Sequence, residues 1–131
     1  MVFLNQFQLA ISAEEEAKVI FEQWYKKQAR EIFTLRVEHY GQKNGFSYQK
    51  VKLSSAKKRW GSCSAKGNLN LTWRLVMMPI AIIDYVIVHE LCHLRELNHS
   101  KRFWANVEEI LPDYKTRRKW LKENGNKFHF P

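Results

Sequence analysis

Residues 89–93 read His-Glu-Leu-Cys-His, and this stretch decides how the rest of the chain is interpreted. It falls inside a helix that we expect over residues 80–97. At 3.6 residues per turn, His89 and His93 share one face about 6 Å apart along the axis, so both imidazoles can reach one metal ion. Glu90 lies beside that face, where a carboxylate can take a proton from metal-bound water. The stretch therefore predicts a metal-dependent hydrolase with zinc as the ion.

A third histidine, His99, follows six residues after His93. Three neutral imidazoles and one water make a tetrahedral catalytic zinc site with an open position. In a continuous helix His99 would lie about 15 Å along the axis from His89, so we expect the chain to turn back just after Leu97. Asn98 suits this turn because asparagine tolerates the left-handed conformation. Three glutamates remain alternative third ligands: Glu96, Glu108 and Glu109.

The N-terminal part of the chain reads as one long helix. Ser12 and Glu15 form a capping box, which predicts a helix that begins at Ala13 and runs to Gly41. Apolar residues recur at helical spacing along it, and we expect this apolar series, Trp24 included, to face the core.

Alternating apolar and polar residues then predict three strands, and capping signals predict two more helices after residue 97. The strands are expected at 48–53, 60–64 and 68–73. Ser100 caps a helix that Pro112 ends, and Asp113 caps a last helix that closes near Asn124. One helix, a small antiparallel sheet of about three strands and three further helices make an α+β fold.

The length and the cysteine content fit one domain, residues 1–131, in a reducing compartment. A chain of 131 residues leaves little room for a second domain. Its longest uncharged apolar run, residues 75–83, is too short to cross a bilayer, and the N-terminus lacks the basic start of a signal peptide. Two cysteines, Cys63 and Cys92, cannot build a disulfide framework. We therefore expect a cytoplasmic protein without membrane contact.

Positive charge is concentrated in the middle of the sequence. The formal net charge is +9, and residues 39–83 contain lysine and arginine but no acidic residue. The electrostatic field of this concentrated positive charge attracts anionic partners, so nucleic acid is a candidate partner of residues 39–83. The alternative interpretation is a solvated sheet face that keeps the protein soluble.

Several sequence blocks resemble the YgjP-like metallopeptidases, a family of compact zincins similar to the SprT-like and Spartan-type proteases. The blocks occur in the family's order: Arg59-Trp60-Gly61-Ser62-Cys63-Ser64, Asn68-Leu69-Asn70-Leu71, Val88-His89-Glu90-Leu91-Cys92-His93-Leu94, Asn98-His99-Ser100, Arg102-Phe103-Trp104 and Leu111-Pro112-Asp113-Tyr114. The resemblance covers residues 48–124 as a family core, whereas residues 1–47, the N-terminal helical region, carry little of it.

The resemblance implies a zincin-like fold, zinc at His89, His93 and His99, and Glu90 as the catalytic glutamate. It implies a peptide or protein substrate. SprT-like relatives are associated with proteins bound or crosslinked to DNA, so by analogy nucleic acid is a candidate partner of segment 39–83. A second hypothesis is a nucleic-acid-binding module with a largely structural zinc.

Three features of the mechanism stay open at this point. Candidate donors to the oxyanion are Tyr114, Arg59, Arg74 and His39. Either Trp60–Ser64 or Asn68–Trp73 is expected to bind the peptide by strand addition. Cys63 either lines that substrate strand or packs in the core. The oligomeric state is left undetermined.

Overall fold

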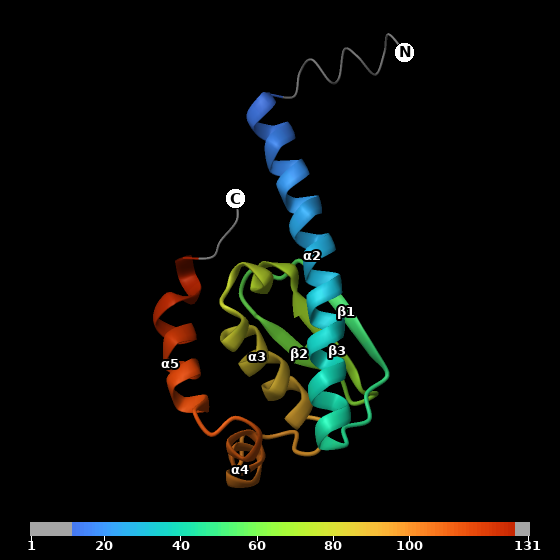
Figure 1. Cartoon of the computed structure of the whole chain (residues 1–131), viewed down its shortest axis with the longest axis vertical. Coiled ribbons are helices and arrows are strands. Elements are labelled where there is room, and N and C mark those ends of the chain that lie inside the picture. Colours follow the sequence, from blue (N-terminus) through green and yellow to red (C-terminus); the bar gives the residue numbers. More distant parts are fainter. Residues whose placement is uncertain (1–11, 128–131) are drawn as a thin grey trace.

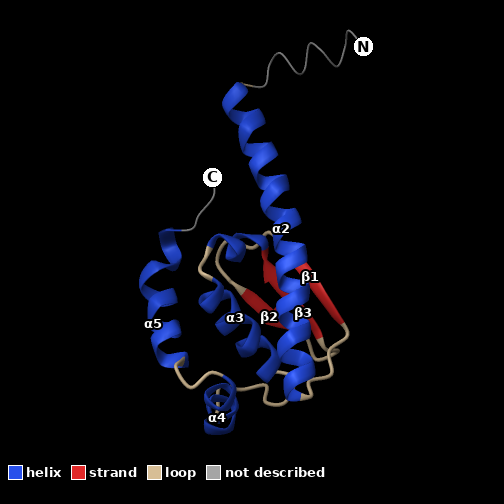
Figure 2. Cartoon of the chain, viewed as in Figure 1, coloured by secondary structure: helices blue, strands red, loops and turns tan. Residues whose placement is uncertain are grey.

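The computed structural model describes residues 12–127. Helices and strands follow in the order α2 (Ala13–Asn44), β1 (Lys50–Ser54), β2 (Gly61–Cys63), β3 (Asn68–Thr72), the short 3-10 helix η1 (Trp73–Met77), α3 (Ile80–Cys92), α4 (Lys101–Ile110), α5 (Tyr114–Asn124) and the 3-10 turn η2 (Gly125–Lys127). Figure 2 shows the three strands of the small sheet beside α2 and α3, with α4 and α5 on the far side of α3. The expected α+β fold is confirmed. Within residues 12–127, no helix combines the length and the apolar character that a membrane crossing requires.

The sheet is mixed rather than antiparallel, which corrects the sequence-based expectation. Its strand order is β1-β3-β2, with β1 parallel to β3 and β2 antiparallel to β3. The connection between β1 and β2 passes the end of β3, where the Thr72 hydroxyl donates to the Ala56 carbonyl and Arg74 donates to the Ser55 carbonyl, each at 2.8 Å. Because this connection carries the chain past β3, β1 and β2 lie on opposite sides of it.

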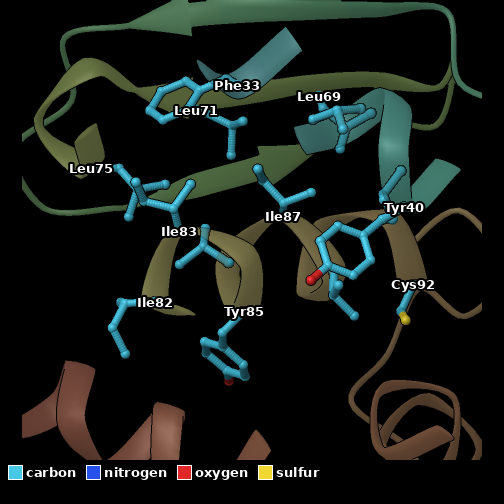
Figure 3. Packing of buried hydrophobic residues seen from close by; sticks show 14 of the residues in the cluster. Phe33, Tyr40, Leu69, Leu71, Leu75, Ile82, Ile83, Tyr85, Ile87 and Cys92 are labelled. Carbon is cyan, nitrogen blue, oxygen red and sulfur yellow. The ribbon is translucent and has the colours of Figure 1, made fainter. Parts of the chain in front are cut away.

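The core lies between the sheet and two helices. Leu69 and Leu71 alternate along β3 and are fully buried, as their period of two on one sheet face requires. Figure 3 shows Ile83 and Ile87 of α3 directed toward these leucines, with Phe33 of α2 beside them. This packing fixes α3, the helix that carries the His-Glu-Leu-Cys-His stretch.

An ion pair joins α2 to α3. The Arg36 guanidinium donates from Nε to Asp84 Oδ1 at 2.7 Å and from Nη2 to Oδ2 at 2.5 Å, and the Tyr40 hydroxyl also donates to Oδ2 at 3.0 Å. Asp84 is buried, so all of these donors compensate for its lost hydration. The contact sets the position of α3 relative to α2 one turn before the histidines.

The first turns of α2 project beyond the body of the molecule (Figure 1). Phe21 and Trp24 are each 54% exposed there, so the expectation that Trp24 belongs to the core is wrong. Helical periodicity identified the apolar residues but could not show that the helix extends beyond the sheet. The helix continues past Gly41 to Asn44, and Gly45, whose φ is 71°, follows as a left-handed C-cap.

Candidate metal centre

The helix α3 ends at Cys92, five residues earlier than the sequence predicts. After it, the N–H groups of His93, Leu94 and Arg95 donate to carbonyls three residues back, which tightens the backbone into 3-10-like turns. Among the described residues only glycines have positive φ, so the left-handed turn expected at Asn98 does not form. Bends at Leu97 and Asn98 then change the chain direction without a left-handed residue.

The reversal brings the three histidines together. His99 directly precedes Ser100, whose hydroxyl accepts from the Phe103 N–H at 3.3 Å and caps α4. The Nε2 atom of His99 lies 3.1 Å from Nε2 of His93 and 3.1 Å from Nε2 of His89. Two nitrogens bound to zinc at 2.0–2.1 Å in tetrahedral geometry lie about 3.3–3.4 Å apart. The spacing of the rings therefore fits one zinc-sized ion.

The protonation of His93 is fixed by its neighbour. Its Nδ1 lies 3.0 Å from the Glu96 carbonyl oxygen. A carbonyl only accepts hydrogen bonds, so Nδ1 carries the proton and Nε2 presents a lone pair to the cluster. Metal-binding histidines commonly have such a carbonyl partner on the second nitrogen. Lone pairs converging at this distance repel one another unless a cation lies between them, so the donor set fits a divalent metal.

Burial keeps the innermost imidazole neutral. Burial, followed by the charges of His93 and His99, lowers the pKa of His89 to about 3. Burial likewise lowers the pKa of His99, although that ring is exposed at the surface. A neutral imidazole is the form that donates a lone pair to a metal.

Aromatic side chains from α4 form a wall behind the histidines. The Phe103 ring lies 4.5 Å from that of His93 and 4.9 Å from that of His89, measured between centroids. Trp104 stacks on His99 at 5.9 Å and on Tyr114 at 5.3 Å. These contacts hold the imidazole planes in place.

Glu90 shares a cavity of about 340 Å³ with the three histidines. The remaining lining comes from Leu97 and from all three residues of β2, so Cys63 lines the cavity rather than the core. Glu90 is 7% exposed, and its burial raises the pKa of its carboxyl to about 7, partly offset by the positive charge of Arg59. Such a group can accept and return a proton near neutral pH.

The alternative third ligands lie outside the cluster. Within residues 12–127, the group of side chains able to hold one metal consists of His89, His93 and His99. Glu108 and Glu109 are exposed on α4, and Glu96 contributes its backbone carbonyl to His93.

None of the four proposed oxyanion donors lines the cavity. Arg74 donates to Ser55, His39 packs against Tyr40, Tyr114 stacks on Trp104, and Arg59 acts on Glu90 through its charge.

Two further residues contribute to the site in ways that the sequence alone did not show. Arg118 of α5 lies over the Trp104 ring at 4.5 Å, and its charge contributes to the lowered pKa values of His89 and His99. Gly61 borders the Glu90 side chain, since a Cβ atom at Gly61 would lie 3.1 Å from Glu90 Cγ. Glycine within the strand signalled a close approach, but the sequence did not show to what.

Comparison with known proteins agrees with this geometry. The chain matches the family described as "YgjP-like, metallopeptidase domain" over residues 4–124. The match includes most of the N-terminal helical region, residues 1–47, although this region carries few of the family's motifs. A solved structure, the metallopeptidase zymogen of Pyrococcus abyssi abylysin, is similar with a TM-score of 0.61 and 26% identity, over 69% of this chain and 93% of that chain. No curated protein matches the chain. The chain belongs to the YgjP-like metallopeptidase family.

Proposed function

We propose that the protein is a zinc-dependent peptidase in which His89, His93 and His99 hold the metal and Glu90 is the general base. The observation that carries this proposal is the convergence of three Nε2 atoms, at 3.1 Å, beside a buried carboxyl in one cavity. A zinc ion held there acts as a Lewis acid and lowers the pKa of a water ligand to about 7.

Glu90 accepts a proton from the attacking water and transfers it to the leaving amine. Its pKa of about 7, raised by burial, matches this double role at neutral pH. The backbone carbonyl of Glu96 orients His93, and the Phe103 ring limits the freedom of the His89 and His93 rings. These neighbours keep the site organised before substrate arrives, which lowers the cost of reaching the transition state.

Of the two strands considered from the sequence, we propose that β2 binds the substrate. β3 is paired on both sides, whereas β2 is an edge strand whose outer side has no partner strand among residues 12–127. Gly61, Ser62 and Cys63 of β2 also line the metal cavity. An extended peptide that adds to this edge through backbone hydrogen bonds therefore passes over the cavity.

Two substitutions test the proposal. Glu90→Gln keeps the shape of the side chain but removes the base, so we expect zinc to stay bound and peptide hydrolysis to be lost. His99→Ala removes one of the three imidazoles, and no other side chain among residues 12–127 belongs to the cluster, so we expect the zinc content to fall well below one equivalent. Glu96→Gln is the matched control, because its backbone carbonyl is unchanged. Metal analysis that shows full zinc in His99→Ala, or unchanged hydrolysis by Glu90→Gln, contradicts the proposal.

A second candidate function is recruitment to nucleic acid. Lys57, Lys58 and Arg59 are exposed in the connection before β2, and the charge of Arg59 reaches Glu90. Phosphate contacts by such side chains bind any sequence and weaken steeply with salt. Binding to DNA should therefore fall by orders of magnitude between about 50 and 200 mM salt. A flat salt dependence contradicts this role.

A further inference from the structure

A second cavity adjoins the metal centre on the other side of Gly61. Its volume is about 190 Å³, and it shares Gly61, His89 and Glu90 with the metal cavity. The rest of its lining comes from three different elements of the chain: Trp60 before β2, Tyr85 and Val86 of α3, and Leu121 of α5. The cavity is thus lined both by groups proposed for catalysis and by apolar side chains.

The apolar walls are held in place by packing. Figure 3 shows Tyr85 pointing away from the sheet core, on the side of the C-terminal helices. Tyr85 and Val86 are each 4% exposed, and the Tyr85 ring lies edge-on to His89 at 5.9 Å. A Cβ atom on Gly125 would lie 3.1 Å from Trp60 Cζ2, so Trp60 is packed closely against the end of α5. The cavity is therefore formed before any ligand arrives.

Apart from His89 and Glu90, the lining offers an apolar surface. Trp60, Val86 and Leu121 contribute aromatic and aliphatic side chains, and burial raises the pKa of Tyr85 to about 12, so its hydroxyl stays neutral. The carboxyl of Glu90 opposes an acidic group. Apolar cavities of about 150 Å³ take up benzene, so this one has room for an aromatic or branched aliphatic side chain.

We propose that this cavity is the specificity pocket of the peptidase and takes the apolar side chain of a residue flanking the scissile bond. The inference rests on the proposed function, since it assumes that a peptide carbonyl lies beside His89 and Glu90. The side chain of a substrate residue next to that carbonyl would then lie beside the cavity. The pocket then selects phenylalanine or leucine over alanine and aspartate.

The test first maps cleavage sites in a peptide library by mass spectrometry. It then compares two blocked peptides that differ only in phenylalanine or alanine at the preferred flanking position. For the zinc-loaded wild type we expect kcat/KM to favour phenylalanine by about 10-fold to 200-fold, the range that hydrophobic pockets achieve. Leu121→Phe fills the pocket and should lower this ratio at least tenfold, whereas Leu121→Ala enlarges it and should retain the preference. Leu35→Ala, on an exposed part of α2, is the matched control and should leave the ratio unchanged.

Peptide binding to zinc-loaded Glu90→Gln, measured by calorimetry, separates this inference from the proposed function. If the phenylalanine peptide binds more tightly than the alanine peptide, and if adding Leu121→Phe abolishes this difference, the pocket is supported. This holds even if the wild type hydrolyses neither peptide, because missing hydrolysis would overturn only the peptidase proposal. Equal binding of both peptides overturns the pocket. So does a kcat/KM ratio that Leu121→Phe leaves unchanged, provided that melting curves and zinc content show this variant to be folded.

Discussion

Replacing Gly61 with alanine tests how the sheet positions the Glu90 carboxyl, the proposed general base. The new Cβ would lie 3.1 Å from three atoms, namely the Asn70 carbonyl oxygen, Leu71 Cδ2 and Glu90 Cγ. Carbon atoms in ordinary contact lie about 3.5–4.0 Å apart, so each neighbour has to give way by about 0.4 Å or more. Asn70 belongs to the central strand and Leu71 is fully buried. The displacement therefore falls mainly on the Glu90 side chain.

The size of the effect follows from that displacement. Overpacking of this kind costs about 1–3 kcal/mol of folding stability. A catalytic group misplaced by about 1 Å loses about 100-fold in rate, so a shift of half this size should lower kcat/KM by about 10-fold to 100-fold. The three histidines do not touch Gly61 in this way, so zinc binding should be retained.

The assay combines three measurements on Gly61→Ala: zinc content, thermal unfolding and kcat/KM on one peptide. Gly45→Ala is the matched control, because Gly45 has a φ of 71° and no atom within 4 Å of a Cβ atom. Alanine in the left-handed region costs about 1–2 kcal/mol, so this control loses similar stability without touching the site. If Gly61→Ala keeps wild-type kcat/KM, or loses no more activity than Gly45→Ala, then Gly61 does not position Glu90.

Three further predictions concern the surroundings of the site. Arg36→Met should cost about 3 kcal/mol in denaturant unfolding because it leaves the Asp84 carboxylate buried, and adding Asp84→Leu should recover most of this loss. A double variant no more stable than Arg36→Met would disprove it. Ser100→Ala removes the cap of α4 and should lower stability by about 1 kcal/mol; an unchanged midpoint would rule the cap out. Chelation should lower the melting temperature, and zinc should restore it; a melting curve indifferent to chelator would argue against a bound metal.

Local sequence signals predicted the elements and the residues of the site, because their physics acts over a few neighbours. Ser12 and Ser100 cap α2 and α4 as expected, since a cap needs only one side chain and the next backbone N–H groups. The spacing of His89, Glu90 and His93 within one helix likewise follows from helical geometry. Sequence reasoning also required that the chain reverse before His99, although the helix ends five residues earlier than predicted and the turn lacks a left-handed residue.

Only the tertiary structure decided how these elements meet. The parallel pairing of β1 with β3 depends on which side of β3 each neighbour occupies, and strand patterns carry no information on this order. The early end of α3, the edge position of β2 and the cavity enclosed by Trp60, Tyr85 and Leu121 likewise arise from contacts between distant segments. The sequence by itself therefore determined which groups could bind a metal and move a proton. The packing of α3 against the sheet and α5 determined where a substrate could lie, because burial and shape exist only after distant segments have come together.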